Sequence, residues 1–250
     1  MTNNAMETIE RRQQQVLCDK KWHVLNKKTW LFRYIPFVDF VFGSGSLAIG
    51  NVDTESDFDV LIGARTGRIF TARFFAALFF GLFGWRRAKA DHRESAANKI
   101  CLNHFVTPAA YKLRLQPNAY WKMLYRALVP IYGAPEAIQK FFDANAAWLG
   151  VSRVVYSDTR HIAAQPSALK RFLEFSIDTF CGNWMEELLK KYQIRRIEAG
   201  LEPAQEFRAP HQMTVLGATE AGSIELKPLI VYNDEELEFH PDPAVIEMVR

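Results

Sequence analysis

The stretch of residues 41–62 constrains the fold of this chain more than any other part of the sequence. The apolar, aromatic and β-branched segment 37–42 is typical of a strand, and the flexible turn 43–46 (Gly-Ser-Gly-Ser) follows it. A short helix over 47–49 and a polar loop then lead to a second apolar strand, 58–62. The pattern therefore predicts two strands of a sheet, with a polar turn after the first and acidic residues at the start of the second.

Two aspartates at the entrance to the second strand indicate a metal site. Asp57 and Asp59 are two positions apart, and side chains at such positions point to the same face of a strand. Two carboxylates on one face repel each other unless a cation lies between them, and oxygen ligands of this kind suit a divalent ion. Ser56 directly precedes the pair, and we expect it to help position the loop.

The Gly45-Ser46 turn is suited to binding phosphate groups. Glycine lets the backbone approach a phosphate closely, and exposed N–H groups together with a serine hydroxyl can donate hydrogen bonds to its oxygens. A metal held by Asp57 and Asp59 would bridge to the same phosphates. A Gly-Ser turn or an Asp-x-Asp pair is common alone, but a strand, Gly-Ser, a short segment and Ser-Asp-x-Asp before an apolar strand form a specific combination.

This combination resembles the nucleotidyltransferases of the DNA polymerase beta superfamily, small bacterial or archaeal type, over residues 37–107. Gly45, Ser46, Asp57 and Asp59 match the four positions of the motif of that family. The resemblance implies a small mixed sheet with helices, Mg²⁺ (or Mn²⁺) bound by the two aspartates, and a nucleoside triphosphate whose phosphates contact Gly45 and Ser46. It also implies transfer of a nucleoside monophosphate to a hydroxyl acceptor, which the sequence does not identify as a small molecule, a protein or an RNA end.

The sequence departs from the family at the third carboxylate, which often serves as the general base. The strand expected over 99–107 contains no acidic residue and has Asn103 at its middle, which we assign as the third site residue. An asparagine oxygen can face a metal, but it cannot accept a proton as a base. Asp91 and Glu94, in the preceding loop, are the alternative source of a carboxylate. By strand parity His104 is predicted to face away from the site.

This departure leaves a second function open. The chain could be a catalytically weakened nucleotide-binding or regulatory module of the same fold.

The remainder of the chain predicts an α+β protein with a mainly helical C-terminal unit. We divide it into a nucleotidyltransferase-like domain, 1–110, and a helical region with short terminal strands, 111–250. The expected segments are helices over 7–34, 118–128, 135–149 and 167–196 with a possible break near Gly182, a linker over 201–210, and strand-like runs over 213–216, 223–226 and 229–232. The acidic residues at 234–238 are interpreted as a solvated edge, and Trp121 and Tyr125 as core residues on one helix face rather than a base-binding wall.

The surroundings of the protein are predicted from its charge, cysteines and apolar segments. The formal net charge of +3 is too small to indicate a long nucleic-acid partner, although it is compatible with a triphosphate. The three cysteines form no disulfide or metal-binding pattern, and Cys101 is expected to be a core residue. The polar N-terminal segment predicts a cytoplasmic protein. The apolar segment 69–85 is expected to form a helix that packs on the sheet, with an interfacial membrane helix as the alternative. The sequence does not indicate the oligomeric state.

Overall fold

The computed structural model describes residues 2–88, 93–113, 119–150, 166–206 and 229–240. These residues form an α+β fold, with a mixed six-stranded sheet between two layers of helices. The helices are α1 (Thr2–Thr29), η1 (Trp30–Tyr34), α2 (Gly45–Ile49), α3 (Ile69–Leu82), α4 (Arg93–Ala96), η2 (Pro108–Ala110), α5 (Ala119–Arg126), α6 (Pro135–Leu149), α7 (Ala168–Phe180) and α8 (Gly182–Glu206). The strands are β1 (Val38–Gly43), β2 (Phe58–Ala64), β3 (Ile100–Val106), β4 (Val129–Gly133), β5 (Leu229–Tyr232) and β6 (Glu236–His240).

The sheet has the strand order β4-β1-β2-β3-β6-β5. Its central neighbours β2 and β3 are parallel, and every other neighbouring pair is antiparallel. The parallel pair requires a crossover connection, which α3 provides. In this topology the first residues of β2, the first residues of β3 and the last residues of β1 lie close together, at the same end of the three strands.

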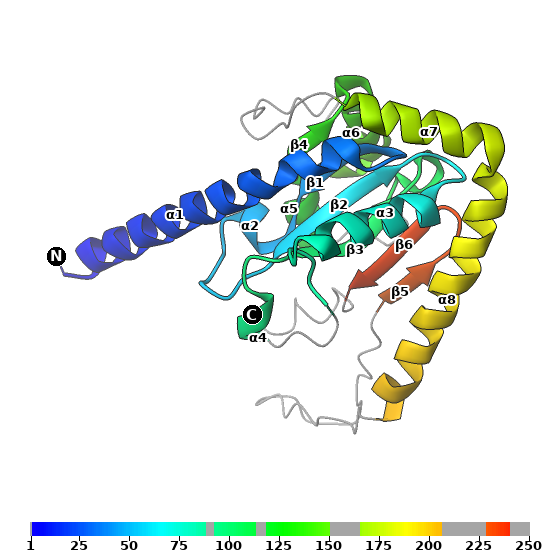
Figure 1. The fold of residues 1–250 in the computed structure, drawn as a ribbon. Helices are drawn as coiled ribbons and strands as arrows, with labels where there is room; N and C mark the ends of the chain where they lie inside the picture. The colour runs from blue at the N-terminus through cyan, green and yellow to red at the C-terminus, as the bar shows by residue number, and fades with distance from the viewer. Residues whose placement is uncertain (1, 89–92, 114–118, 151–165, 207–228, 241–250) are drawn as a thin grey trace, which may run out of the picture.

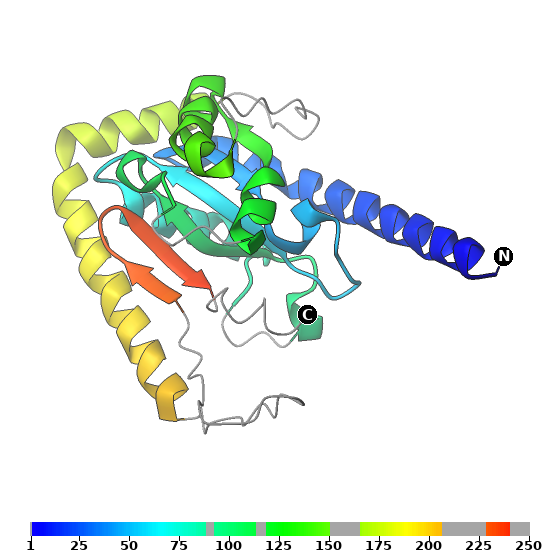
Figure 2. The ribbon, with the colours of Figure 1, turned by 180° about the vertical axis from the view of Figure 1, so that it is seen from behind.

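Helices cover both faces of the sheet and create two apolar cores. On one face, visible in front in Figure 1, α1, α3 and α7 contribute Leu25, Phe70 and Ile177 to the first core. On the other face, seen from behind in Figure 2, α5 and α6 cover the sheet and enclose the second core. Trp121 and Tyr125 are only 3% exposed in this second core, which confirms their interpretation as packing residues.

The apolar helix α3 packs against the sheet, as the sequence predicts. Residues on its inner face, including Phe70 and Phe80, are fully buried, whereas its end carries the exposed side chains of Leu82 and Phe83. Across the described residues, no helix combines the length and apolar character needed to cross a bilayer.

The C-terminal part of the chain adds strands to the same sheet. β4 includes Pro130, at which the sequence predicts only the end of a helix; as an edge strand, β4 accommodates a proline. The interpretation of residues 234–238 as a solvated edge is wrong for Glu236 and Glu238, which are buried in β6. α8 extends to Glu206, beyond the predicted start of the linker, and the runs 213–216 and 223–226 lie outside the described residues. The division into 1–110 and 111–250 stays a prediction, but the sheet crosses its boundary.

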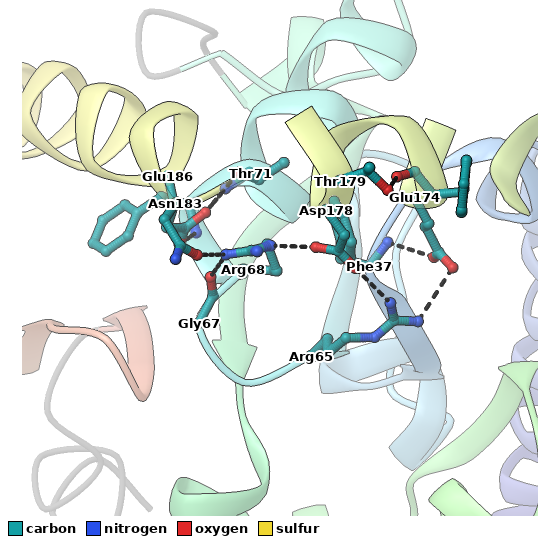
Figure 3. A network of polar contacts seen from close by, with 12 residues as sticks. Phe37, Arg65, Gly67, Arg68, Thr71, Glu174, Asp178, Thr179, Asn183 and Glu186 are labelled. Carbon is teal, nitrogen blue, oxygen red and sulfur yellow. Dashed lines mark hydrogen bonds and ion pairs between the residues drawn. The ribbon is translucent and has the colours of Figure 1, made fainter. Parts of the chain in front are cut away.

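The α7–α8 pair is attached to the start of α3 through hydrogen bonds to a buried carboxylate and through a more exposed ion pair (Figure 3). Glu186 accepts hydrogen bonds from the N–H groups of Phe70 and Thr71, both at 2.9 Å, and from the Thr71 hydroxyl at 2.6 Å. Nearby, Arg68 Nε donates to Asp178 at 2.8 Å. The Glu186 carboxylate satisfies N–H groups that the first turn of a helix leaves without intrahelical partners, and it thereby fixes α8 against α3.

Candidate active site

The turn after β1 brings the backbone of Gly45 against the side chain of Asp59. Gly45 begins α2 with a φ of +63°, and a Cβ atom at this position would lie 2.2 Å from Asp59 Oδ2. The N–H of Ser44 donates to the carbonyl of Asp59 at 3.0 Å, which ties the turn to β2. A glycine is therefore required here both by the left-handed backbone and by the close approach of the carboxylate. Ser46 lies in the first turn of α2 and is half-buried.

Asp57, Asp59 and Cys101 form a compact group, which we call the Asp57 triad. Their ligand atoms all lie within 4.8 Å of one another, and all three side chains are half-buried. Asp59 and Cys101 are direct partners across the parallel β2–β3 pairing. The predicted convergence of the two aspartates is thus present, beside the predicted turn.

Arg87 contacts this group from the segment that follows α3. The side-chain Nη1 atom of Arg87 lies 2.6 Å from Asp57 Oδ2. The backbone N–H of Arg87 donates to the carbonyl of Ile100 at 2.9 Å. Partial burial lowers the pKa of the guanidinium, but the Asp57 carboxylate outweighs this effect and the pKa of Arg87 is raised. Arg87 therefore brings a permanent positive charge to the triad, suitable for a phosphate oxygen or for balancing Asp57.

Cys101 is the residue of β3 that lies closest to the two aspartates among the potential metal ligands of the described residues. Burial, followed by the charges of Asp59 and Asp57, raises the pKa of the Cys101 thiol well above its usual value. The thiol stays neutral at physiological pH and is half-buried beside two acids, so its interpretation as a plain core residue is wrong. It is a weak ligand for a hard ion such as Mg²⁺.

A shift in the β2–β3 register lies between the pair Asp59–Cys101 and the pair Leu61–His104. The pairing advances from Asp59 and Cys101 to Leu61 and His104, so β3 contains one more residue than β2 over this interval. Such a bulge reverses the alternation of side chains beyond it. The prediction that His104 faces away from the site is wrong, because His104 is on the same sheet face as Asp59. The assignment of Asn103 as third site residue stays a prediction.

Side chains of α1 hold the loops that carry the Asp57 triad. Gln14 Nε2 donates to the carbonyls of Gly50 and Val52, at 3.0 and 2.9 Å. Lys21 Nζ donates to the carbonyls of Thr54 and Ser56, at 2.8 and 2.9 Å, immediately before Asp57. Burial lowers the pKa of Lys21, although Asp53 and Asp57 oppose this effect.

The anchoring role of α1 is absent from the sequence interpretation. Lys28 Nζ donates to the carbonyl of Asn98, just before β3. Gln14, Lys21 and Lys28 recur at the spacing that keeps residues on one face of a helix, and this periodicity is the signal that could have identified them.

The predicted role of Ser56 in its loop is confirmed. The hydroxyl of Ser56 accepts a hydrogen bond from the N–H of Asp53 at 2.9 Å and donates one to Asp53 Oδ1 at 3.0 Å. Asp53 Oδ1 also accepts from the N–H of Glu55 at 2.9 Å. Through these hydrogen bonds, Asp53 and Ser56 close the turn that leads into Asp57.

A cavity of about 420 Å³ lies between α1 and α2. Its lining combines aromatic, amide and carboxylate side chains, among them Trp22, His23, Asn26 and Asp19. None of its lining residues belongs to the Asp57 triad.

Searches against protein-family models, curated proteins and solved structures find no match to this chain. Its chemistry therefore has to be inferred from the Asp57 triad itself. Two carboxylates suit a hard divalent ion through oxygen, and Arg87 adds a charge for an anionic ligand. The group is thus suited to binding a metal ion together with a phosphate.

Proposed function

We propose that the chain is a metal-dependent nucleotidyltransferase that transfers a nucleoside monophosphate from a nucleoside triphosphate to a hydroxyl acceptor. The observation that carries this proposal is the convergence of Asp57, Asp59 and Cys101 within 4.8 Å, against the backbone of Gly45. A mixed sheet with the acidic pair at the start of β2 supports it further.

Each residue of the site has a defined task in this proposal. Asp57 and Asp59 hold the Mg²⁺ or Mn²⁺ ion, which, when bound, neutralises charge on the phosphates. Gly45 and Ser46 contact the β and γ phosphates, and Arg87 moves from Asp57 to a phosphate oxygen. The acceptor oxygen forms a bond to the α phosphorus, the bond from that phosphorus to the bridging oxygen breaks, and pyrophosphate leaves with the electron pair. The proton of the acceptor is released to water, because neither Asn103 nor the neutral Cys101 is a base.

The test measures turnover directly. The chain is incubated with each of the common nucleoside triphosphates, labelled at the α phosphate, with Mg²⁺ or Mn²⁺ and a pool of hydroxyl acceptors. We expect pyrophosphate and a labelled product that disappear in Asp57→Asn and Asp59→Asn. Asp143→Asn, at an exposed position of α6, is the matched control and retains activity. The same loss in all three variants would contradict the role of the Asp57 triad.

A second function, a nucleotide-binding regulatory module, is favoured by the position of Cys101. The β3 partner of Asp59 is a thiol, so the triad supplies two carboxylates and no third. Triphosphate binding in the presence of Mg²⁺ without pyrophosphate release would support this function over an active enzyme.

Two variants test whether the missing third carboxylate is the reason for slow or absent turnover. Cys101→Asp introduces a carboxylate opposite Asp59, whereas Asn103→Asp introduces one within the bulge. We expect Cys101→Asp to raise turnover by at least tenfold and Asn103→Asp to raise it less. A larger gain from Asn103→Asp would support Asn103 as the third site residue. Failure of every triphosphate to bind with Mg²⁺ would exclude both functions.

A further inference from the structure

A second group of potential metal ligands lies inside the protein, on β3 and β6. His104, Glu236 and Glu238, which we call the His104 triad, have exposed fractions of only 5%, 7% and 3%. His104 is the direct partner of Glu238 in the antiparallel β3–β6 pairing, and Glu236 is the partner of Val106. All three side chains therefore point to the sheet face covered by α5 and α6.

The spacing within the His104 triad fits ligands around one ion. The ligand atoms of the three residues all lie within 4.8 Å of one another. His104 Nε2 lies 3.5 Å from Glu236 Oε1, beyond the usual length of a hydrogen bond. Ligands bound to Zn²⁺ at about 2.1 Å in tetrahedral geometry are separated from one another by roughly 3.4 Å. The observed distance is close to this ligand-to-ligand separation.

The charge around the triad also favours a cation. The carboxylates of Glu236 and Glu238 are both buried, with the imidazole of His104 beside them. Two buried carboxylates carry more negative charge than one imidazole can neutralise, so a cation is attracted to this position.

We propose that His104, Glu236 and Glu238 bind a divalent transition-metal ion, best matched by Zn²⁺, which fastens the β5–β6 hairpin to β3. An imidazole nitrogen with two carboxylates suits Zn²⁺ better than Mg²⁺ or Ca²⁺, which take oxygen ligands. The two carboxylates come from the hairpin and the imidazole from the central sheet, so the ion joins the two. A metal that joins segments in this way contributes directly to folding stability.

The contacts of the β5–β6 hairpin show where a bound ion would stabilise its attachment to the sheet. Besides its strand pairing with β3, the hairpin packs Leu237 and Phe239 against the first core, and the Thr107 N–H donates to the Glu235 carbonyl at 2.8 Å. A mostly exposed ion pair, Lys190 Nζ to Asp234 at 2.7 Å, connects it to α8. Exposed pairs of this kind contribute little stability. Leu237 packs on the opposite sheet face from the His104 triad, so a ligand at the triad would hold the hairpin from the face covered by α5 and α6.

The proposal does not depend on the proposed nucleotidyltransferase activity. The Asp57 triad offers two carboxylates and a thiol, whereas the His104 triad offers an imidazole and two buried carboxylates further along β3. The two groups should therefore prefer different ions, and variants of one group should leave the other able to bind.

The experiment measures metal content in the full chain. Protein carrying Asp57→Asn and Cys101→Ser, which weaken the Asp57 triad, is stripped with a chelator, exposed to Zn²⁺, desalted and analysed for bound zinc. We expect about one equivalent of zinc per chain, in keeping with a single three-residue site. Adding Glu238→Gln, nearly the same shape without the charge, removes this equivalent; Glu235→Gln, at an exposed neighbouring position, is the matched control.

A second readout keeps the proposal testable if a variant is unstable. In the unsubstituted chain, Zn²⁺ should raise the melting temperature and slow proteolysis within the β5–β6 hairpin, and Co²⁺ should give the visible absorption bands of a tetrahedral site. Mg²⁺ should give none of these effects. Retention of zinc by a folded Glu238→Gln variant, or an unchanged melting temperature of the stripped chain after zinc addition, would overturn the proposal.

Discussion

Replacing Gly45 by alanine tests whether the turn after β1 lies against Asp59. The left-handed backbone at φ +63° costs a non-glycine residue about 1–2 kcal/mol. The new Cβ would also lie 2.2 Å from Asp59 Oδ2 and 2.9 Å from its Cβ and Cγ atoms, and overpacking of this kind costs about 1–3 kcal/mol. We therefore expect Gly45→Ala to lower the free energy of unfolding by roughly 2–5 kcal/mol.

Gly50→Ala is the matched control, because it isolates the backbone contribution. Gly50 ends the same short helix with a φ of +84°, and no atom lies within 4 Å of a Cβ added there. It should lose only the conformational part, about 1–2 kcal/mol. The two losses are compared by urea unfolding, followed by tryptophan fluorescence.

A double-mutant cycle with Asp59→Ala then attributes the additional loss to one contact. Asp59→Ala removes the Oδ2 and Cγ atoms that the Gly45→Ala methyl would meet, so the two substitutions should couple by about 1 kcal/mol or more. Equal losses for Gly45→Ala and Gly50→Ala, or additive effects in the cycle, would refute the reasoning.

Three further predictions concern the buried side chains of Glu186 and Lys170 and the thiol of Cys101. Glu186→Ala should lower the free energy of unfolding by about 2–4 kcal/mol in urea titrations, because it removes three hydrogen bonds to a buried carboxylate. The control Glu187→Ala, at the exposed neighbouring position, should change this free energy by less than about 0.5 kcal/mol. Similar losses in the two variants would contradict a specific role of the Glu186 hydrogen bonds. Burial lowers the pKa of Lys170 to about 8, so the folded chain holds fewer protons than the unfolded chain above that pH, and stability should rise from pH 8 towards pH 10. Lys170→Met should reduce this rise in thermal melts, and an unchanged slope would argue against it. At pH 8, iodoacetamide should modify the exposed Cys181 at least about tenfold faster than the half-buried Cys101, as followed by mass spectrometry. The reason is that burial and nearby carboxylates raise the pKa of the Cys101 thiol, and equal rates would contradict this environment.

Local patterns predicted much of the fold correctly. The expected helix over 135–149 coincides with α6, which begins with Pro135 and is followed by Gly150 in the left-handed conformation. Proline at a first helical turn and glycine just past a last one are local preferences of the backbone, so they are readable without knowledge of the fold. β4 was missed because Pro130 suggests an interruption, and only its edge position makes that proline compatible with a strand.

The interpretation of the acidic end failed for a different reason. A run of acids reads as solvent-exposed because charged side chains are costly to bury. Glu236 and Glu238 are nevertheless buried, since β6 lies between β3 and β5 and both its faces are covered. Nothing in the local sequence shows which strands will flank a segment.

For the candidate site, the sequence by itself determined the acidic pair and the glycine turn. Asp57 and Asp59 share a face because strand geometry alternates side chains, and this holds in any sheet. Gly45 could be recognised as a position of close backbone approach, although the group it approaches in the structure is Asp59.

Only the tertiary structure decided which residues of β3 and α1 join the site. β3 pairs Cys101 with Asp59, and the bulge beyond this pair turns His104 to the same face, whereas regular alternation along an isolated strand predicts the opposite for His104. Lys21 reaches the loop before Asp57 from a distant helix. Register and long-range contacts depend on how separate segments pack together, so no local pattern encodes them.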